Sequence, residues 1–187
     1  MAVSPAAARG QAVRQRLLDA AVALVPELGW PAVSTRILAE RAGVTPSVVH
    51  YHFPSLQVLL VEGVLGAMRE VAGAFAPMLE TAGTPEEAVD AVLASVGGYT
   101  GTDPTSLLFA EAYLAATRDD TLRQGIRDLL ADLRTKVGGW LAANGVAEAE
   151  ATAAVLFATV DGLLLHRALE PETDPGVMAA VLRRLVR

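Results

Sequence analysis

The chain has 187 residues, of which 52% are hydrophobic and 19% charged, so it can bury a substantial core and is too apolar for extended disorder. It contains no cysteine, which excludes disulfides, thiol nucleophiles and thiolate metal sites. The longest apolar stretch, residues 151–165, is interrupted by Asp161 and is too short to span a bilayer. Because the first ten residues also lack the apolar core of an export signal, we expect a cytoplasmic protein without a membrane partner.

The net charge of −6 is unevenly distributed along the chain. Residues 1–57 carry five basic and three acidic side chains, a net charge of +2. Residues 58–187 carry ten basic and eighteen acidic side chains, a net charge of −8. A small basic head on an acidic body predicts that the two parts have different tasks.

Apolar residues recur every three or four positions along nearly the whole chain, which predicts an all-α protein of about nine helices. The first helix ends at Gly29, and Ser34 caps a short second helix that Gly43 terminates. Thr45 caps a third helix and places Pro46 in its first turn. Three helices in about 45 residues, with a glycine turn between the second and third, have the helix-turn-helix layout.

The remaining chain predicts a larger helical body. We divide the chain into a domain at residues 1–54 and a second domain at residues 55–187. Turn and cap residues place the later helices at about 55–81, 85–98, 104–118, 120–144, 147–169 and 174–187.

Three pieces of sequence between Arg16 and Leu60 occur together in one known family: LLDAA with a glycine at 29, LAERAGVT at 38–45 and VHYHF at 49–53. In this order and spacing they resemble the DNA-binding domain of TetR-type (tetracycline-repressor-type) transcriptional regulators. The resemblance implies a homodimeric repressor that binds a palindromic DNA operator and is released by a small-molecule effector. It assigns DNA binding to residues 1–54, and effector binding and dimerisation to residues 55–187.

The third helix has two different faces. Val49 and Phe53 lie four residues apart and are expected to pack on the first helix, whereas the opposite face is polar. A major groove admits one α-helix, so this polar face suits base edges and phosphates. Helix capping by Ser34 and Thr45, packing by Tyr51 and an internal hydrogen bond of His52 are the alternatives. The predicted DNA contacts are Ser34, Thr35, Arg36, Thr45, Pro46, Ser47, His50, Tyr51 and His52.

The segment departs from the family pattern at two positions. His50 stands where the family usually has a tyrosine, and Leu56 stands where it usually has a phosphate-binding lysine. Loss of a phosphate contact lowers operator affinity and its salt dependence. We expect Arg9, Arg14 and Arg16 to compensate from the first helix.

A helix-turn-helix head reads DNA as a two-fold pair, so the body is expected to form a homodimer. Apolar stripes on the last two helices of each subunit can pair in a four-helix arrangement, although the same stripes can pack inside one subunit. The candidate interface residues are Phe157, Val160, Leu164, Val177, Val181 and Leu185.

The middle helices are expected to enclose an apolar effector cavity. Its candidate contacts are large apolar side chains and two polar anchors, each of which can also be an ordinary structural residue. Composition favours an apolar or aromatic ligand and gives no sign of a cofactor. The candidate contacts are Met68, Phe75, Met78, Tyr99, Phe109, Glu111, Tyr113, Arg118 and Trp140.

The helix after the head carries Gly63 and Gly66, and each costs about 1 kcal/mol relative to alanine. Close helix packing explains them, as does a helix that tilts when the ligand enters and thereby moves the recognition helices. Two other functions stay open, an activator or global regulator on the same scaffold and a helical ligand-binding or enzymatic bundle. We expect neither an enzyme nor a metal site, because His50 and His52 diverge on one helix and no catalytic constellation occurs.

Overall fold

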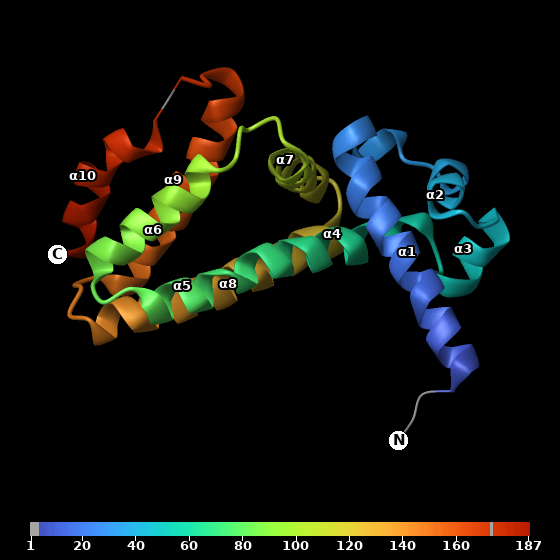
Figure 1. The fold of residues 1–187 in the computed structure, drawn as a ribbon, viewed down its shortest axis with the longest axis horizontal. Coiled ribbons are helices and arrows are strands. Elements are labelled where there is room, and N and C mark those ends of the chain that lie inside the picture. Colours follow the sequence, from blue (N-terminus) through green and yellow to red (C-terminus); the bar gives the residue numbers. More distant parts are fainter. Residues whose placement is uncertain (1–3, 173) are drawn as a thin grey trace.

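The computed structural model describes residues 4–172 and 174–187, and over these residues it contains helices and no strand (Figure 1). The all-α expectation of about nine helices is confirmed, with one expected helix divided in two. The α-helices are α1 (Pro5–Leu28), α2 (Thr35–Ala42), α3 (Pro46–His52), α4 (Leu56–Gly73), α5 (Phe75–Thr81), α6 (Pro85–Gly97), α7 (Pro104–Ala116), α8 (Asp120–Ala143), α9 (Ala149–Leu169) and α10 (Ala179–Leu182). Three short 3₁₀ segments are η1 (Trp30–Ala32), η2 (Pro175–Met178) and η3 (Arg183–Val186).

The turn chemistry of the head is largely as expected. The Ser34 hydroxyl accepts a hydrogen bond from the Ile37 N–H at 3.3 Å and so caps α2. Gly43 ends α2 with a φ of 66°, a left-handed conformation that glycine adopts without penalty. Thr45 occupies the N-cap position of α3, but its hydroxyl lies 2.8 Å from the Ser47 hydroxyl and makes no capping bond to the backbone. The prediction that Thr45 caps α3 is therefore wrong for its hydroxyl, which contacts the Ser47 hydroxyl instead of a backbone N–H.

The head and the adjoining body share one hydrophobic core. Leu17 and Leu24 of α1 pack with Val49 and Phe53 beneath α3, and the same cluster continues through α4 to Leu122 in α8. The expected boundary at residues 54 and 55 is thus not an interruption of the core. Figure 1 shows this head at one end of an elongated molecule, with α4 and α8 running side by side toward the other end.

A second core lies at the far end, where α6, α9 and the C-terminal segment meet the end of α8. Val89 and Leu93 of α6 pack there with Leu141, Leu182 and Val186. The larger cavity described below is lined by residues of both cores, and the smaller one is lined by residues of the second core.

The expected helix at about residues 55–81 is divided into α4 and α5 at Ala74. Pro77 explains the position of the break. A proline removes the hydrogen bond to the carbonyl four residues earlier, here Gly73, and its ring collides with that carbonyl. The chain therefore leaves the α-helical ladder at Gly73 and resumes it at Phe75.

The expected last helix at about 174–187 is also corrected, since it consists of η2, the four-residue α10 and η3. A short terminal segment gains little from helix propagation, so tertiary contacts decide its conformation. Leu182 and Val186 are buried, and the Arg183 guanidinium forms two hydrogen bonds of 2.8 Å to Asp90 of α6. These contacts fasten the segment to α6.

One helix in the described part of the chain, α9, is long and apolar enough by length and composition to cross a membrane. Only 11% of its most apolar window is buried inside the chain. The helix therefore carries apolar surface that is not used in the core of one subunit.

Candidate functional site

Helix α3, the predicted recognition helix, is held to the head by one face and is open on the other. Val49 and Phe53 are 1% and 2% exposed, as the spacing predicted, and both belong to the core beneath α3. The opposite side leaves Pro46, Ser47 and His50 in solvent. The polar face of α3 is therefore outside the globule, where a DNA groove can reach it.

Tyr51 and His52 differ in exposure. Tyr51 is 84% exposed and His52 is half-buried, with their rings edge to face at 5.1 Å between centroids. Ser34 and Arg36 at the start of α2 are exposed and Thr35 is half-buried. All nine predicted DNA contacts thus lie at least partly on the surface of α2, α3 and the turns before them.

The three arginines of α1 differ in their exposure and in their contacts. Arg9 and Arg16 are exposed. Arg14 forms an ion pair with Glu62 of α4 at 2.5 Å, and its guanidinium carbon lies 4.7 Å from the centroid of the Phe53 ring. Arg14 therefore fastens α4 to α1 beside the recognition helix, which leaves Arg9 and Arg16 as the arginines of α1 open to phosphate.

The two glycines of α4 also differ. A β-carbon at Gly63 would lie 3.3 Å from the Leu18 carbonyl oxygen and 3.4 Å from the Ala21 β-carbon. Gly63 therefore allows α4 to approach α1 closely, which is the packing explanation. A β-carbon at Gly66 would meet no atom within 4 Å, so packing does not explain that glycine.

A large cavity lies in the body between α4, α5, α6, α7, α8 and α9, with about 980 Å³ of empty space including its opening. A second cavity, with about 550 Å³ of empty space including its opening, adjoins it between α5, α6, α8, α9 and the C-terminal segment. Six of the nine candidate ligand contacts line the large cavity, and Trp140 lines the second. The six are Met68, Phe75, Met78, Tyr99, Phe109 and Tyr113.

Asp161 supplies the one charged side chain among the described residues that line the large cavity. The Tyr113 hydroxyl donates a hydrogen bond of 2.9 Å to its carboxylate. Burial raises the pKa of Asp161, an effect that the Tyr113 hydrogen bond partly opposes. Burial and the neighbouring carboxylate together raise the pKa of Tyr113. Asp161 was not among the candidate ligand contacts, although its isolation in an apolar stretch was a signal in the sequence.

The two expected polar anchors, Glu111 and Arg118, lie elsewhere. Glu111 faces the head, where its carboxylate accepts a hydrogen bond of 2.8 Å from the Trp30 backbone N–H. Arg118 is exposed, and neither residue lines the two cavities. The helical period of α7 explains the placement of Glu111, because Phe109 and Tyr113 turn toward the cavity and the residue between them turns away.

The candidate interface stripes separate in the structure. Phe157, Val160 and Leu164 were expected at the dimer interface, with packing inside one subunit as the alternative, and in the structure they line the large cavity. The outer face of α9 has a different stripe at intervals of three, four and seven residues. Its exposed members are Ala151, Val155, Ala158, Leu165 and Leu169. The C-terminal stripe is exposed as expected, at 75% for Val177, 55% for Val181 and 40% for Leu185.

Comparison with known proteins finds two family models on the chain. One, described as "Bacterial regulatory proteins, tetR family", matches residues 17–62, and one described as "Tetracyclin repressor-like, C-terminal domain" matches residues 83–187. The transcriptional regulator BetI of Rhizobium meliloti is 29% identical over 162 residues, covering 84% of this chain and 78% of the relative.

Solved structures with the same fold include a transcriptional regulator from Streptomyces coelicolor A3(2), with a TM-score of 0.78 and 28% identity. That match covers 93% of this chain and 98% of the other. The multidrug-binding protein EbrR, solved with malachite green, matches with a TM-score of 0.66 and 30% identity over 93% of this chain and 98% of EbrR.

Proposed function

Because the chain belongs to the TetR family of bacterial transcriptional regulators, we propose that it is a homodimeric repressor that binds a palindromic operator and is released by a small molecule. In this proposal residues 1–54 bind DNA, residues 55–187 bind the effector and dimerise, and the protein acts in the cytoplasm. The family is one of regulators, and we assign this chain no catalytic role.

The outward polar face of α3 carries the proposal. Hydroxyl, imidazole and phenol groups stand in solvent at Ser47, His50 and Tyr51, while Val49 and Phe53 fix the helix from beneath. Side chains of these kinds donate to and accept from base edges and phosphates in a major groove. We propose that the α3 helices of the two subunits enter successive major grooves of a two-fold site, with the start of each α2 against the DNA backbone or the groove edge.

The apolar outer stripe of α9 supports the dimer. Val155, Leu165 and Leu169 are 50%, 50% and 80% exposed, and the C-terminal stripe lies exposed in the same part of the chain. Small residues at Ala158 and Gly162 lie between them, and a β-carbon at Gly162 would meet no atom within 4 Å. A second copy of α9 and the C-terminal segment would bury these surfaces in an isologous contact.

The cavity supports release by a small molecule. It is lined mostly by apolar side chains with a few polar groups, which is the composition of small-molecule sites. EbrR, at 30% identity, binds malachite green. We propose that the large cavity here is the effector site, and that its occupation moves α4 and α7, which line the cavity and pack on the head.

The test uses the purified full chain and labelled DNA from upstream of its own coding sequence, which often carries the target in this family. We expect fluorescence anisotropy to show binding at least a hundredfold tighter than to a scrambled duplex of the same length. Light scattering should give a dimer at the concentrations that bind. Equal affinity for both duplexes, or a monomer that binds the operator, would contradict the proposal.

A further inference from the structure

The two cavities are adjoining compartments that share a wall. Phe75, Val92, Phe157 and Val160 line both of them. The rings of Phe75 and Phe157 meet edge to face, with centroids 5.5 Å apart and an angle of 65° between their planes. The two phenyl rings therefore lie at the boundary between the compartments, together with two valine side chains.

The larger compartment is built to hold positive charge. Asp161 places a carboxylate in it, and Tyr113 fixes one carboxylate oxygen with the 2.9 Å hydrogen bond. No Lys, Arg or His lines this compartment in the described chain, and none of the ion pairs found there includes Asp161. A partly buried carboxylate without a cationic partner favours a ligand that brings the charge itself.

Aromatic rings line the same compartment as this carboxylate. Five of the lining side chains are aromatic, and the negative face of an aromatic ring attracts an ammonium group most strongly where water is excluded. Organic cations gain from both features, whereas an anionic ligand would meet the Asp161 charge. The five aromatic residues are Phe75, Tyr99, Phe109, Tyr113 and Phe157.

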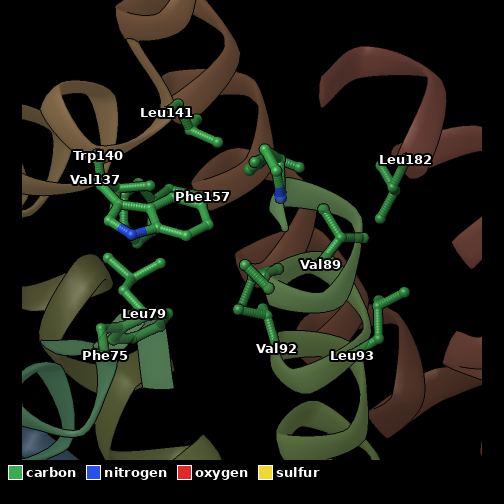
Figure 2. A pocket seen from close by; sticks show the side chains of 14 residues that line it. Phe75, Leu79, Val89, Val92, Leu93, Val137, Trp140, Leu141, Phe157 and Leu182 are labelled. Atoms are coloured by element: carbon green, nitrogen blue, oxygen red, sulfur yellow. The ribbon is translucent and has the colours of Figure 1, made fainter. Parts of the chain in front are cut away.

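The smaller compartment has the opposite character. None of its lining side chains carries a charge or an oxygen atom, and the indole nitrogen of Trp140 is their one polar atom. Figure 2 shows Val89, Val92 and Leu93 along one side of it, with Phe75, Trp140 and Phe157 across from them. Such a space suits an alkyl or aryl group and offers nothing to a charged or hydroxylated one.

We propose that the effector is an amphiphilic organic cation. Its ammonium group binds beside Asp161 among the aromatic rings, and its apolar tail passes the Phe75–Phe157 pair into the smaller compartment. That the cation acts as an effector rests on the proposed function. Binding of the cation to the chain does not, and it can be measured without DNA. The negative body, with a net charge of −8 over residues 58–187, would favour approach of cations over anions.

The test is calorimetric titration of the full chain with tetramethylammonium, butyltrimethylammonium and octyltrimethylammonium, below any micelle-forming concentration. Octan-1-ol and octanoate serve as the neutral and anionic counterparts of the octyl compound. We expect affinity to rise with chain length, by up to about fourfold for each buried methylene group. Octyltrimethylammonium should bind at least tenfold more tightly than octan-1-ol or octanoate, and Trp140 should change its fluorescence only with the longer tails.

Two variants separate the compartments. Asp161→Asn keeps the side-chain shape. It should lower the affinity for octyltrimethylammonium at least tenfold and leave the affinity for octan-1-ol unchanged. Asp128→Asn, which removes an equal charge from the exposed surface of α8, should leave both affinities unchanged. Ala88→Leu reduces the smaller compartment and should lower affinity for the octyl compound while sparing tetramethylammonium.

The wild-type ligand series is decisive even if a variant fails to fold. Equal or tighter binding of octan-1-ol or octanoate would overturn the assignment of a cation, and affinity independent of chain length would overturn the assignment of a tail. Failure of the proposed function is seen separately, since octyltrimethylammonium would then bind as described without releasing any operator.

Discussion

The Glu111 carboxylate accepts its 2.8 Å hydrogen bond from the backbone of Trp30, so a residue of the ligand-binding body holds the turn that ends α1. Phe109 and Tyr113, two residues before and after Glu111, line the large cavity. Helix α7 therefore contacts the cavity with one face and the head with another. A second contact, 2.6 Å from the Gln57 amide to Asp119, joins the turn after α7 to the start of α4.

Glu111→Ala tests whether this contact transmits ligand binding. Binding of one ligand typically changes the affinity for another by about 5- to 150-fold in coupled systems. The quantity to measure is the operator Kd with saturating octyltrimethylammonium divided by the operator Kd without it. We expect this ratio to be at least threefold smaller in the variant than in the wild type. Loss of a charged hydrogen bond should also lower the free energy of unfolding by about 1–2 kcal/mol.

The control for this experiment is Glu80→Ala, which removes an exposed acid from α5 at a distance from the turn. It should keep the wild-type ratio. An unchanged ratio in Glu111→Ala as well would show that the hydrogen bond stabilises the head without transmitting the ligand signal.

Tyr51→Ala tests the recognition face. Because Tyr51 is 84% exposed and its one ring contact is with His52, stability should change by less than about 0.5 kcal/mol. Loss of a specific base contact costs about 1–3 kcal/mol, so operator affinity measured by anisotropy should fall about 5- to 150-fold. Gln124→Ala, on the exposed surface of α8, is the matched control and should bind the operator as the wild type does. Full operator affinity in Tyr51→Ala would remove this residue from the interface.

The head was predictable from sequence because its signals are local. Ser34 fixes a helix end through its hydroxyl, and Gly43 and Pro46 do so through their backbone conformations. The spacing of Val49 and Phe53 sets the buried face of α3. The break at Ala74 was equally local in origin, since Pro77 carried its signal. The hydroxyl of Thr45 was harder to place, because Ser47 competes with the backbone for it.

The body was less predictable, because the sequence of an apolar stripe does not determine which neighbouring helix packs against it. Phe157 and Val155 are both apolar and lie two residues apart on α9, yet one lines the cavity and the other faces solvent. Only the positions of α6 and α8 decide between the two faces. Glu111 and Asp161 show the same limit, since sequence identifies charged residues in apolar helices but not which of them meets the cavity.

Val155→Glu tests the dimer surface. The Val155 side chain is half exposed, so the glutamate can remain solvated in a folded monomer, whereas a buried carboxylate at a two-fold contact would face its own copy. We expect light scattering to give a monomer with a wild-type circular dichroism spectrum and an operator affinity reduced at least tenfold. Leu114→Glu, at a similarly exposed apolar residue of α7, should stay dimeric. A dimeric Val155→Glu protein would place the interface elsewhere.

Gly101→Ala tests the junction between the α6–α7 loop and the end of α9. Gly101 has a φ of 81°, and a β-carbon there would lie 2.3 Å from the Ala168 backbone nitrogen. Neither the conformation nor the space admits alanine, so we expect the free energy of unfolding to fall by about 2–4 kcal/mol in urea denaturation. Gly139→Ala in α8, where a β-carbon meets nothing within 4 Å, should instead raise it by about 0.5–1 kcal/mol. Equal stability of the two variants would contradict the close approach at Gly101.

The pH dependence of stability tests the environment of Asp161. Because its pKa is raised in the folded chain, the folded protein keeps a proton that the unfolded chain has released once the pH exceeds the ordinary aspartate value of 3.8. Stability contributed by that proton is fully present below the ordinary pKa and is lost as the pH rises through the raised value. Tyr113, which also lines the cavity, does not interfere below neutral pH, because burial and the Asp161 carboxylate raise its pKa above the ordinary phenol value.

Asp161→Asn removes this effect, since asparagine keeps the polar contact with Tyr113 and cannot ionise. The Tm of the variant should therefore exceed that of the wild type by an amount that grows from pH 4 upward and then becomes constant. At neutral pH, saturating octyltrimethylammonium should raise the Tm of the wild type above that of the variant, because the cation stabilises the ionised carboxylate of the wild type. At pH 4 it should raise the Tm of the wild type much less. A difference in Tm that is independent of pH would show that the Asp161 carboxylate is well solvated in the folded chain, and water would then screen its attraction for a cation in the cavity.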